Sequence, residues 1–292
     1  MYSQIASNKR KTSILILLFI TIVALLGYFL GVISGYGYWG LIFAAIYSGV
    51  ATLISYYNSD KIALWSTGAK AIKKEDNPYV YRMVENLCIT SGQPTPAVYL
   101  IDDPAPNAFA TGRDPEHASI ALTTGIIKAL ENEELEGVIA HELSHIKNYD
   151  IRIMTIVIGL IGIITILANI FLHNMFWRNS DNDRNNNPIF LIIGIVLAIL
   201  SPLIAQIIQL AISRKREFLA DASGALLTRY PEGLASALNK ISRYNAPLQK
   251  VSTATAHLFI TNPLGGKFSV SNLFSTHPPI EERINALMEM GR

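Results

Sequence analysis

The sequence has little cysteine and little charge. Cys88 is the single cysteine among 292 residues, which excludes an internal disulfide and fits a reducing compartment. Charged side chains make up 16% of the chain, compared with about 25% in an average soluble domain. The net charge of +2 is too small to indicate nucleic acid as a partner.

The missing charge is concentrated in four apolar segments. Each has at least about 20 residues without Asp, Glu, Lys or Arg, the length that a helix needs to cross a bilayer. They are residues 14–33, 38–57, 153–177 and 185–213. We expect two membrane hairpins, with residues 178–187 as the polar loop of the second. The alternatives are a cleaved signal peptide at the first segment, and buried or partly immersed helices at the last two.

Basic residues flank these segments on one side. Clusters precede the first segment and follow the second and the fourth: Lys9, Arg10 and Lys11; Lys61, Lys70, Lys73 and Lys74; Arg214, Lys215 and Arg216. The positive-inside rule predicts that both termini and residues 60–150 are cytoplasmic, in a multi-pass protein of the cell membrane.

The polar region before the third segment has an α+β pattern. Residues 68–85 are predicted to be helical, and residues 97–101, 107–111 and 118–123 to be strands. Asn132 or Thr124 is the expected cap of the helices that follow. A helix through residues 138–145 then leads to the third apolar segment, which puts its side chains close to the membrane surface.

The sequence His141-Glu142-Leu143-Ser144-His145 is a metal-binding pattern. Two histidines four residues apart lie on one face of a helix, so both imidazoles reach one ion. The glutamate between them is placed to take a proton from the attacking water. This arrangement is typical of zinc peptidases.

A catalytic zinc needs a third protein ligand. The candidates include His117, His173, His257 and His277, but Glu217 is the best placed. It lies four residues before Asp221 on one predicted helical face. Glu217 would bind the metal while Asp221 would accept the second N–H of a zinc-bound histidine. Because both flanks of a membrane hairpin return to the same side, Glu217 would meet the histidine pair.

Five stretches together resemble the HtpX family of membrane zinc metallopeptidases, relatives of the CAAX prenyl endopeptidase. They are residues 106–112, 141–145, 213–221, 255–264 and 274–284. The resemblance implies one Zn²⁺ per chain on His141, His145 and Glu217, with Glu142 as general base. It also implies a catalytic role for His277 and an edge strand at Asn107, Ala108 and Phe109 that binds an extended peptide. Arg283 would contact substrate, although pairing with a helix-end carboxylate is the simpler alternative.

The predicted fold is an α-helical membrane protein with a small α+β, gluzincin-like catalytic domain. Its parts are a cytoplasmic tail at 1–12, a hairpin at 13–57, catalytic regions at 58–152 and 214–292, and a second hairpin at 153–213. The predicted activity is zinc-dependent cleavage of misfolded or damaged membrane proteins at the cytoplasmic face, a quality-control and stress-response function. The alternatives are an intramembrane-cleaving metalloprotease and a non-catalytic, metal-stabilised scaffold. The expected partners are polypeptide substrates and the lipid bilayer.

Overall fold

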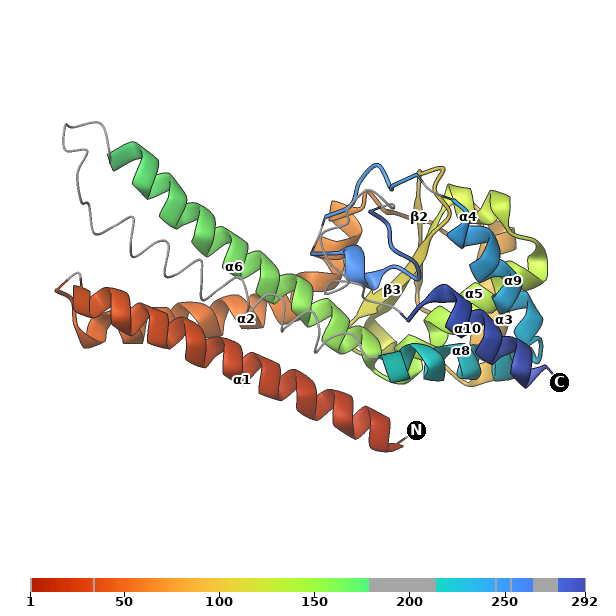
Figure 1. The fold of residues 1–292 in the computed structure, drawn as a ribbon, viewed down its shortest axis with the longest axis horizontal. Helices are drawn as coiled ribbons and strands as arrows, with labels where there is room; N and C mark the ends of the chain where they lie inside the picture. The colour runs from red at the N-terminus through yellow and green to blue at the C-terminus, as the bar shows by residue number, and fades with distance from the viewer. Residues whose placement is uncertain are drawn as a thin grey trace.

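Three long apolar helices project from a compact α/β part (Figure 1). The computed structural model describes residues 2–33, 35–178, 214–244, 246–252, 254–264 and 278–291. Within them, α1 (Tyr2–Ile33), α2 (Tyr38–Ser66) and α6 (Asp150–Arg178) are the long helices. The first three apolar segments are therefore helical. The predicted loop at 178–187 and the fourth segment lie beyond the described residues, apart from Arg178.

Two of the described helices are long and apolar enough to cross a membrane. They are Ile5–Phe29, with a mean hydropathy of 2.5, and Tyr38–Ser66, with 1.5. Only 22% and 17% of their most apolar windows are buried inside the protein. The core helix of a soluble protein would be mostly buried, so these outward apolar side chains favour contact with lipid.

Glycines allow α1 and α2 to cross at short distance. A Cβ atom added at Gly40 would lie 2.3 Å from the carbonyl oxygen of Gly27 and 2.7 Å from the Cα of Gly31. Gly27 and Gly31 are four residues apart, the spacing with which small residues let two membrane helices pack backbone to backbone.

The sheet has four strands in the order β1-β2-β4-β3. They are β1 (Lys70–Ala71), β2 (Ala97–Ile101), β3 (Ala108–Gly112) and β4 (Ala118–Thr123). β2 and β4 are parallel, whereas β1 and β3 pair antiparallel with their neighbours. The strands predicted at 97–101 and 118–123 are confirmed, and the third is displaced by one residue. β3 forms an edge of the sheet.

The shorter helices gather mainly on one side of the sheet (Figure 1). They are α3 (Pro78–Ser91), α4 (Thr124–Ala129), α5 (Asn132–Lys147), α8 (Arg214–Thr228), α9 (Pro231–Ser242) and α10 (Ile280–Met290), with 3₁₀ turns at Pro115–His117 and Ala256–Leu258. The predicted helix at 68–85 is wrong in its first half. The helix begins at Pro78 because Asn77 caps it, accepting from the backbone N–H of Val80.

The predicted caps of the next two helices are wrong by one residue. Thr123, not Thr124, caps α4 through its hydroxyl, which accepts from the N–H of Ile126 at 3.1 Å. α5 starts after Glu131 rather than with Asn132 as the cap. The backbone N–H of Glu131 donates to the Glu134 carboxylate at 2.8 Å, the returning half of a capping box.

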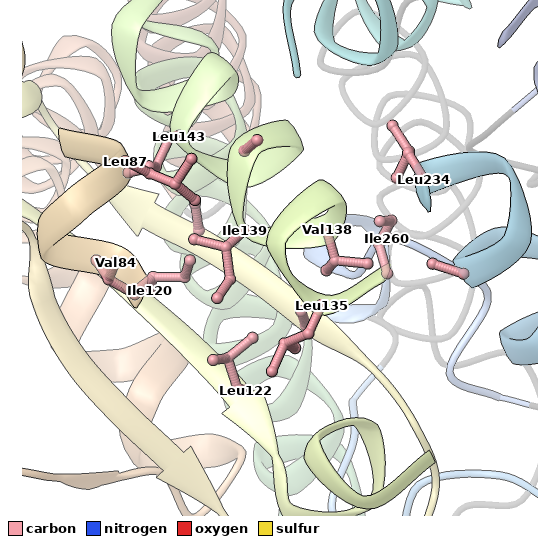
Figure 2. Packing of buried hydrophobic residues seen from close by; sticks show 14 of the residues in the cluster. Val84, Leu87, Ile120, Leu122, Leu135, Val138, Ile139, Leu143, Leu234 and Ile260 are labelled. Atoms are coloured by element: carbon pink, nitrogen blue, oxygen red, sulfur yellow. The ribbon is translucent and has the colours of Figure 1, made fainter. Parts of the chain in front are cut away.

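Both faces of the sheet are covered. Residues of α5 pack between the sheet and α9, with α3 beside them (Figure 2). The fully buried side chains of this layer include Leu135, Ile139 and Leu143 of α5 and Ile120 and Leu122 of β4. The opposite face of the sheet packs on the C-terminal end of α2, the first turns of α6 and residues 248–259. α5 and the start of α6 are thereby fixed relative to the edge strand β3.

Candidate metal centre

Helix α5 presents His141 and His145 to helix α8. Both imidazoles are buried, at 1% and 4% exposure. α8 approaches α5 closely because it has a glycine at the contact. A Cβ atom added at Gly224 would lie 3.0 Å from the backbone nitrogen of His141. This close packing brings the N-terminal half of α8, which carries Glu217, against the two histidines.

Three metal-binding side chains converge there. The Nε2 atoms of His141 and His145 lie 3.1 Å apart. The Glu217 carboxylate oxygens lie 4.0 Å from His141 Nε2 and 3.7 Å from His145 Nε2. One potential ligand atom from each of the three residues can be chosen so that all three atoms lie within 4.8 Å of one another. Two imidazoles and a carboxylate suit Zn²⁺, and three protein ligands leave a position for reacting groups. The cluster therefore fits a catalytic metal ion.

A carboxylate oxygen lies close to the second nitrogen of each imidazole. Asp221 Oδ1 lies 2.9 Å from Nδ1 of His141, and Asp150 Oδ2 lies 3.0 Å from Nδ1 of His145. Such partners fix the ring orientation and the tautomer of metal-binding histidines. Asp221 was predicted to act on one histidine, and sequence reasoning missed Asp150.

Asp150 reaches His145 because the chain breaks between α5 and α6. α5 ends at Lys147, Tyr149 has a positive φ of 59°, and α6 begins at Asp150. A left-handed conformation at a non-glycine residue is uncommon. The break turns the carboxylate back toward the histidine. Oδ1 of Asp150 also accepts from Nδ2 of Asn8 at 2.8 Å, which ties the start of α1 to the metal centre. The position of Asp150 shortly after the metal-binding helix is the feature of the sequence that could have indicated this role.

Arg283 of α10 supports the acidic groups of α8. Its side chain is fully buried and donates through Nε and Nη2 to both oxygens of Asp221, at 2.8 and 2.7 Å. Nη1 donates to the carbonyl of Ile260 at 3.2 Å and lies 3.9 Å from Glu217 Oε2. A bidentate pair of this kind is strong and geometrically specific. Arg283 thus pairs with a carboxylate, as the simpler alternative had it, but that carboxylate lies in the middle of α8 and not at a helix end. Substrate contact stays a prediction.

Burial and neighbouring charges tune the ligands. Burial lowers the pKa of His141 to about 4, which outweighs the opposite effect of Asp221. Burial also lowers the pKa of His145, but Asp150 and Glu217 outweigh it and raise the value to about 9. Since a metal binds neutral imidazole, a raised pKa at His145 makes protons compete with the ion for this ligand.

The pKa values of Glu142 and Asp221 are shifted in opposite directions. Burial raises the pKa of Glu142 to about 7, and the nearby Glu217 acts in the same direction. Burial would also raise the pKa of Asp221, but Arg283 and His141 lower it to about 2. Asp221 is therefore a permanent anion. A glutamate that titrates near neutrality is suited to accept and return a proton.

The edge strand β3 runs beside Glu142. Phe109 turns to the opposite face of the sheet and packs on Phe259, with ring centroids 4.9 Å apart. The backbone N–H of Ala110 donates to the Glu142 carboxylate. The carbonyl of Ala108 accepts from the N–H of Ile260 at 3.0 Å.

Residues 260 and 261 cover the beginning of this edge. Besides the Ile260 contact, Nδ2 of Asn107 donates to the carbonyl of Thr261 at 3.2 Å. Oδ1 of Asn107 accepts from the N–H of Ala108 at 3.0 Å. Substrate binding at Asn107, Ala108 and Phe109 stays a prediction. So does the catalytic role of His277, which lies outside the described residues.

Comparisons with known proteins show which family the chain belongs to. Residues 74–291 match peptidase family M48. A protease HtpX homolog of Caldanaerobacter subterraneus subsp. tengcongensis is 47% identical over 295 residues, covering 99% of this chain and 98% of its own. Another from Tropheryma whipplei is 46% identical over 292 residues, covering 100% and 99%.

A solved structure shares the fold. The crystal structure of S. mikatae Ste24p superposes with a TM-score of 0.54 at 19% identity, over 98% of this chain and 67% of that one. The predicted resemblance to HtpX metallopeptidases is confirmed, and the membrane-capable helices are consistent with it. This chain belongs to peptidase family M48 and is a membrane metalloprotease.

Proposed function

We propose that this chain is an integral membrane zinc endopeptidase that cleaves misfolded or damaged membrane proteins at the cytoplasmic face. The observation that carries the proposal is the convergence of His141, His145 and Glu217, with a buried glutamate beside them. The three side chains would hold Zn²⁺. The bound ion supplies Lewis acidity, which acidifies water and polarises a peptide carbonyl.

Glu142 would carry the proton through the reaction. Its carboxylate accepts the proton that the attacking water loses, and then gives it to the nitrogen of the leaving amine. The raised pKa of about 7 supports both steps, because the group holds a proton readily and releases it readily near neutral pH. The N–H of Ala110, which donates to this carboxylate, orients it. Asp221 and Asp150 keep the two imidazoles in place.

The substrate would bind as an added strand along β3. In the antiparallel register, Asn107 pairs with Thr123, and Phe109 and Thr111 also turn their backbone groups to β4. The backbone N–H and C=O groups of Ala108, Ala110 and Gly112 therefore point away from β4, toward the outer edge of the sheet. The Ala108 carbonyl is bonded to Ile260 and the Gly112 N–H to Thr155. The Ala110 carbonyl, next to Glu142, is the group that we assign to the substrate backbone.

The charge pattern supports a cytoplasmic site. Lys9, Arg10 and Lys11 lie at the N-terminal end of α1, and Lys61 lies near the C-terminal end of α2. Because α2 leads into β1 and α5 leads into α6, the metal centre lies at the end of the helices that carries these cations. Loops and tails of unfolded membrane proteins would reach it there.

Glu142→Gln tests the proposed chemistry. The variant keeps the size and burial of the side chain but removes the base, so cleavage of casein should fall by about 10²–10⁴-fold while zinc content is unchanged. Glu133→Gln is the matched control, because Glu133 is an exposed residue of the same helix. Wild-type cleavage by Glu142→Gln would exclude the base.

The same assay distinguishes the two alternatives. A metal-stabilised scaffold would bind zinc but cleave neither casein nor a membrane protein, even as the wild-type chain. An intramembrane protease would cleave a transmembrane segment and leave casein intact. Cleavage of casein by the wild type, lost in Glu142→Gln, supports a site that soluble chains reach.

A further inference from the structure

A cavity of about 510 Å³ lies between α1, α2 and the start of α6, and none of the three candidate metal ligands lines it. From α1 it is lined at every third or fourth residue, by Lys9, Thr12, Ile16 and Ile20 among others. One face of α2 also lines the cavity, and α6 contributes Arg152. Continuous faces of two helices therefore form its walls.

The cavity is polar at one end and apolar at the other. Lys9 and Arg152 lie at the end where α1 begins and α2 approaches the sheet, and Tyr56 and Tyr57 of α2 join them. Further along α1, the lining residues Ile16 and Ile20 are apolar. Basic and tyrosine side chains mark the level of the membrane surface, and the apolar part extends into the hydrocarbon.

The two cations lack a carboxylate partner. No Asp or Glu lines the cavity within the described residues, and neither Lys9 nor Arg152 forms an ion pair there. Arg152 donates through Nε to the Tyr56 hydroxyl at 2.9 Å. Lys9 Nζ lies 4.6 Å from the ring centroid of Tyr149. Two cationic side chains whose contacts are uncharged tyrosines favour an anionic ligand.

Thr52 gives an independent indication of a ligand. It lines the cavity and is 3% exposed, and its hydroxyl has no hydrogen-bond partner among the described residues. A helical threonine normally satisfies its hydroxyl with a carbonyl of the preceding turn, as Thr12 does with Asn8 at 3.0 Å. A buried hydroxyl without a partner is unfavourable unless a ligand or water satisfies it.

We propose that this cavity binds one anionic phospholipid from the cytoplasmic leaflet. Its phosphate would lie between Lys9 and Arg152. Its glycerol ester region would accept from Thr52, and an acyl chain would run along Ile16 and Ile20. Basic pockets between membrane helices suit anionic headgroups. An acyl chain accounts for the apolar wall, which a free phosphate would leave uncovered.

The test is a lipid titration of the full-length protein in detergent, read by native mass spectrometry. Short-chain phosphatidylglycerol, phosphatidylcholine and free glycerol 3-phosphate are the probes. The wild type should bind one phosphatidylglycerol in preference to phosphatidylcholine, and glycerol 3-phosphate should not displace it. Equal binding of the two lipids, or displacement by glycerol 3-phosphate at comparable concentration, would overturn the proposal.

Variants assign the preference to the cavity. Lys9→Gln and Arg152→Gln should each weaken phosphatidylglycerol binding about fivefold, the usual effect of one basic residue at a membrane surface. Arg152→Lys should retain it. Lys11→Gln is the matched control, since Lys11 is an exposed lysine of α1 that does not line the cavity. Unchanged binding by folded Lys9→Gln or by folded Arg152→Gln contradicts the site.

Discussion

Asp150 is predicted to control the metal affinity of His145, although it binds no metal itself. Its two oxygens are each engaged, one by His145 Nδ1 at 3.0 Å and the other by Asn8 Nδ2 at 2.8 Å. In Asp150→Asn, an NH₂ group replaces one of these oxygens and then faces the N–H of either His145 or Asn8. Either the imidazole or Asn8 then loses its acceptor, and the imidazole also loses a charged partner.

The expected effect is a 10–100-fold loss of zinc affinity, or about 1.4–2.7 kcal/mol, the usual cost of removing such a partner. The assay is competition for Zn²⁺ between the purified protein and a chromophoric chelator at fixed pH. Asn8→Ala is the matched control, because it removes the hydrogen bond from Asn8 to Asp150 and leaves the His145 pair intact. Asp150→Asn with wild-type affinity would refute the reasoning, as would an equal loss in Asn8→Ala.

Three further predictions concern the surroundings of the site and the membrane topology. Arg283→Met should lower the thermal unfolding midpoint, because it removes the bidentate cationic partner of the buried Asp221 carboxylate at a cost of about 3–5 kcal/mol; an unchanged midpoint contradicts this. Burial would raise the pKa of Glu134, but its lysine and serine partners lower it below the model-peptide value of 4.5. Its contribution to stability is thus present above that pH and lost below it, and Glu134→Gln should flatten this part of the pH dependence of unfolding. A cysteine at Asn186 should react with a membrane-impermeant maleimide from outside the cell, since burial raises the pKa of Cys88 to about 11 and keeps that thiol unreactive; labelling from the cytoplasm only would show that the second hairpin does not span.

Local patterns in the sequence predict the parts of the site that lie within one helix. The spacing of His141 and His145 requires only helical geometry, and the same holds for Glu217 and Asp221. The apolar lengths of α1 and α2 likewise follow from composition. Strands β2 and β4 are predicted correctly because each is a short apolar run bounded by turn residues.

The missed features depend on tertiary structure or on one backbone dihedral. Asp150 points to His145 because Tyr149 takes a left-handed conformation, which no helical pattern indicates. The sequence offered a carboxylate partner for Arg283 but not which one, because Arg283 and Asp221 are 62 positions apart and helical periodicity carries no information over that distance. β1 has only two residues and is too short to leave an alternating pattern. Its pairing with β2 replaces the predicted start of a helix.

The metal content of wild type and Glu217→Ala tests the central claim most directly. Both proteins are purified, dialysed against a weak chelator and measured for zinc per chain. Two imidazoles alone bind zinc weakly, so we expect one zinc per wild-type chain and almost none in the variant. A variant that retains one zinc per chain would contradict the assignment of Glu217, and with it the metal centre shared by α5 and α8.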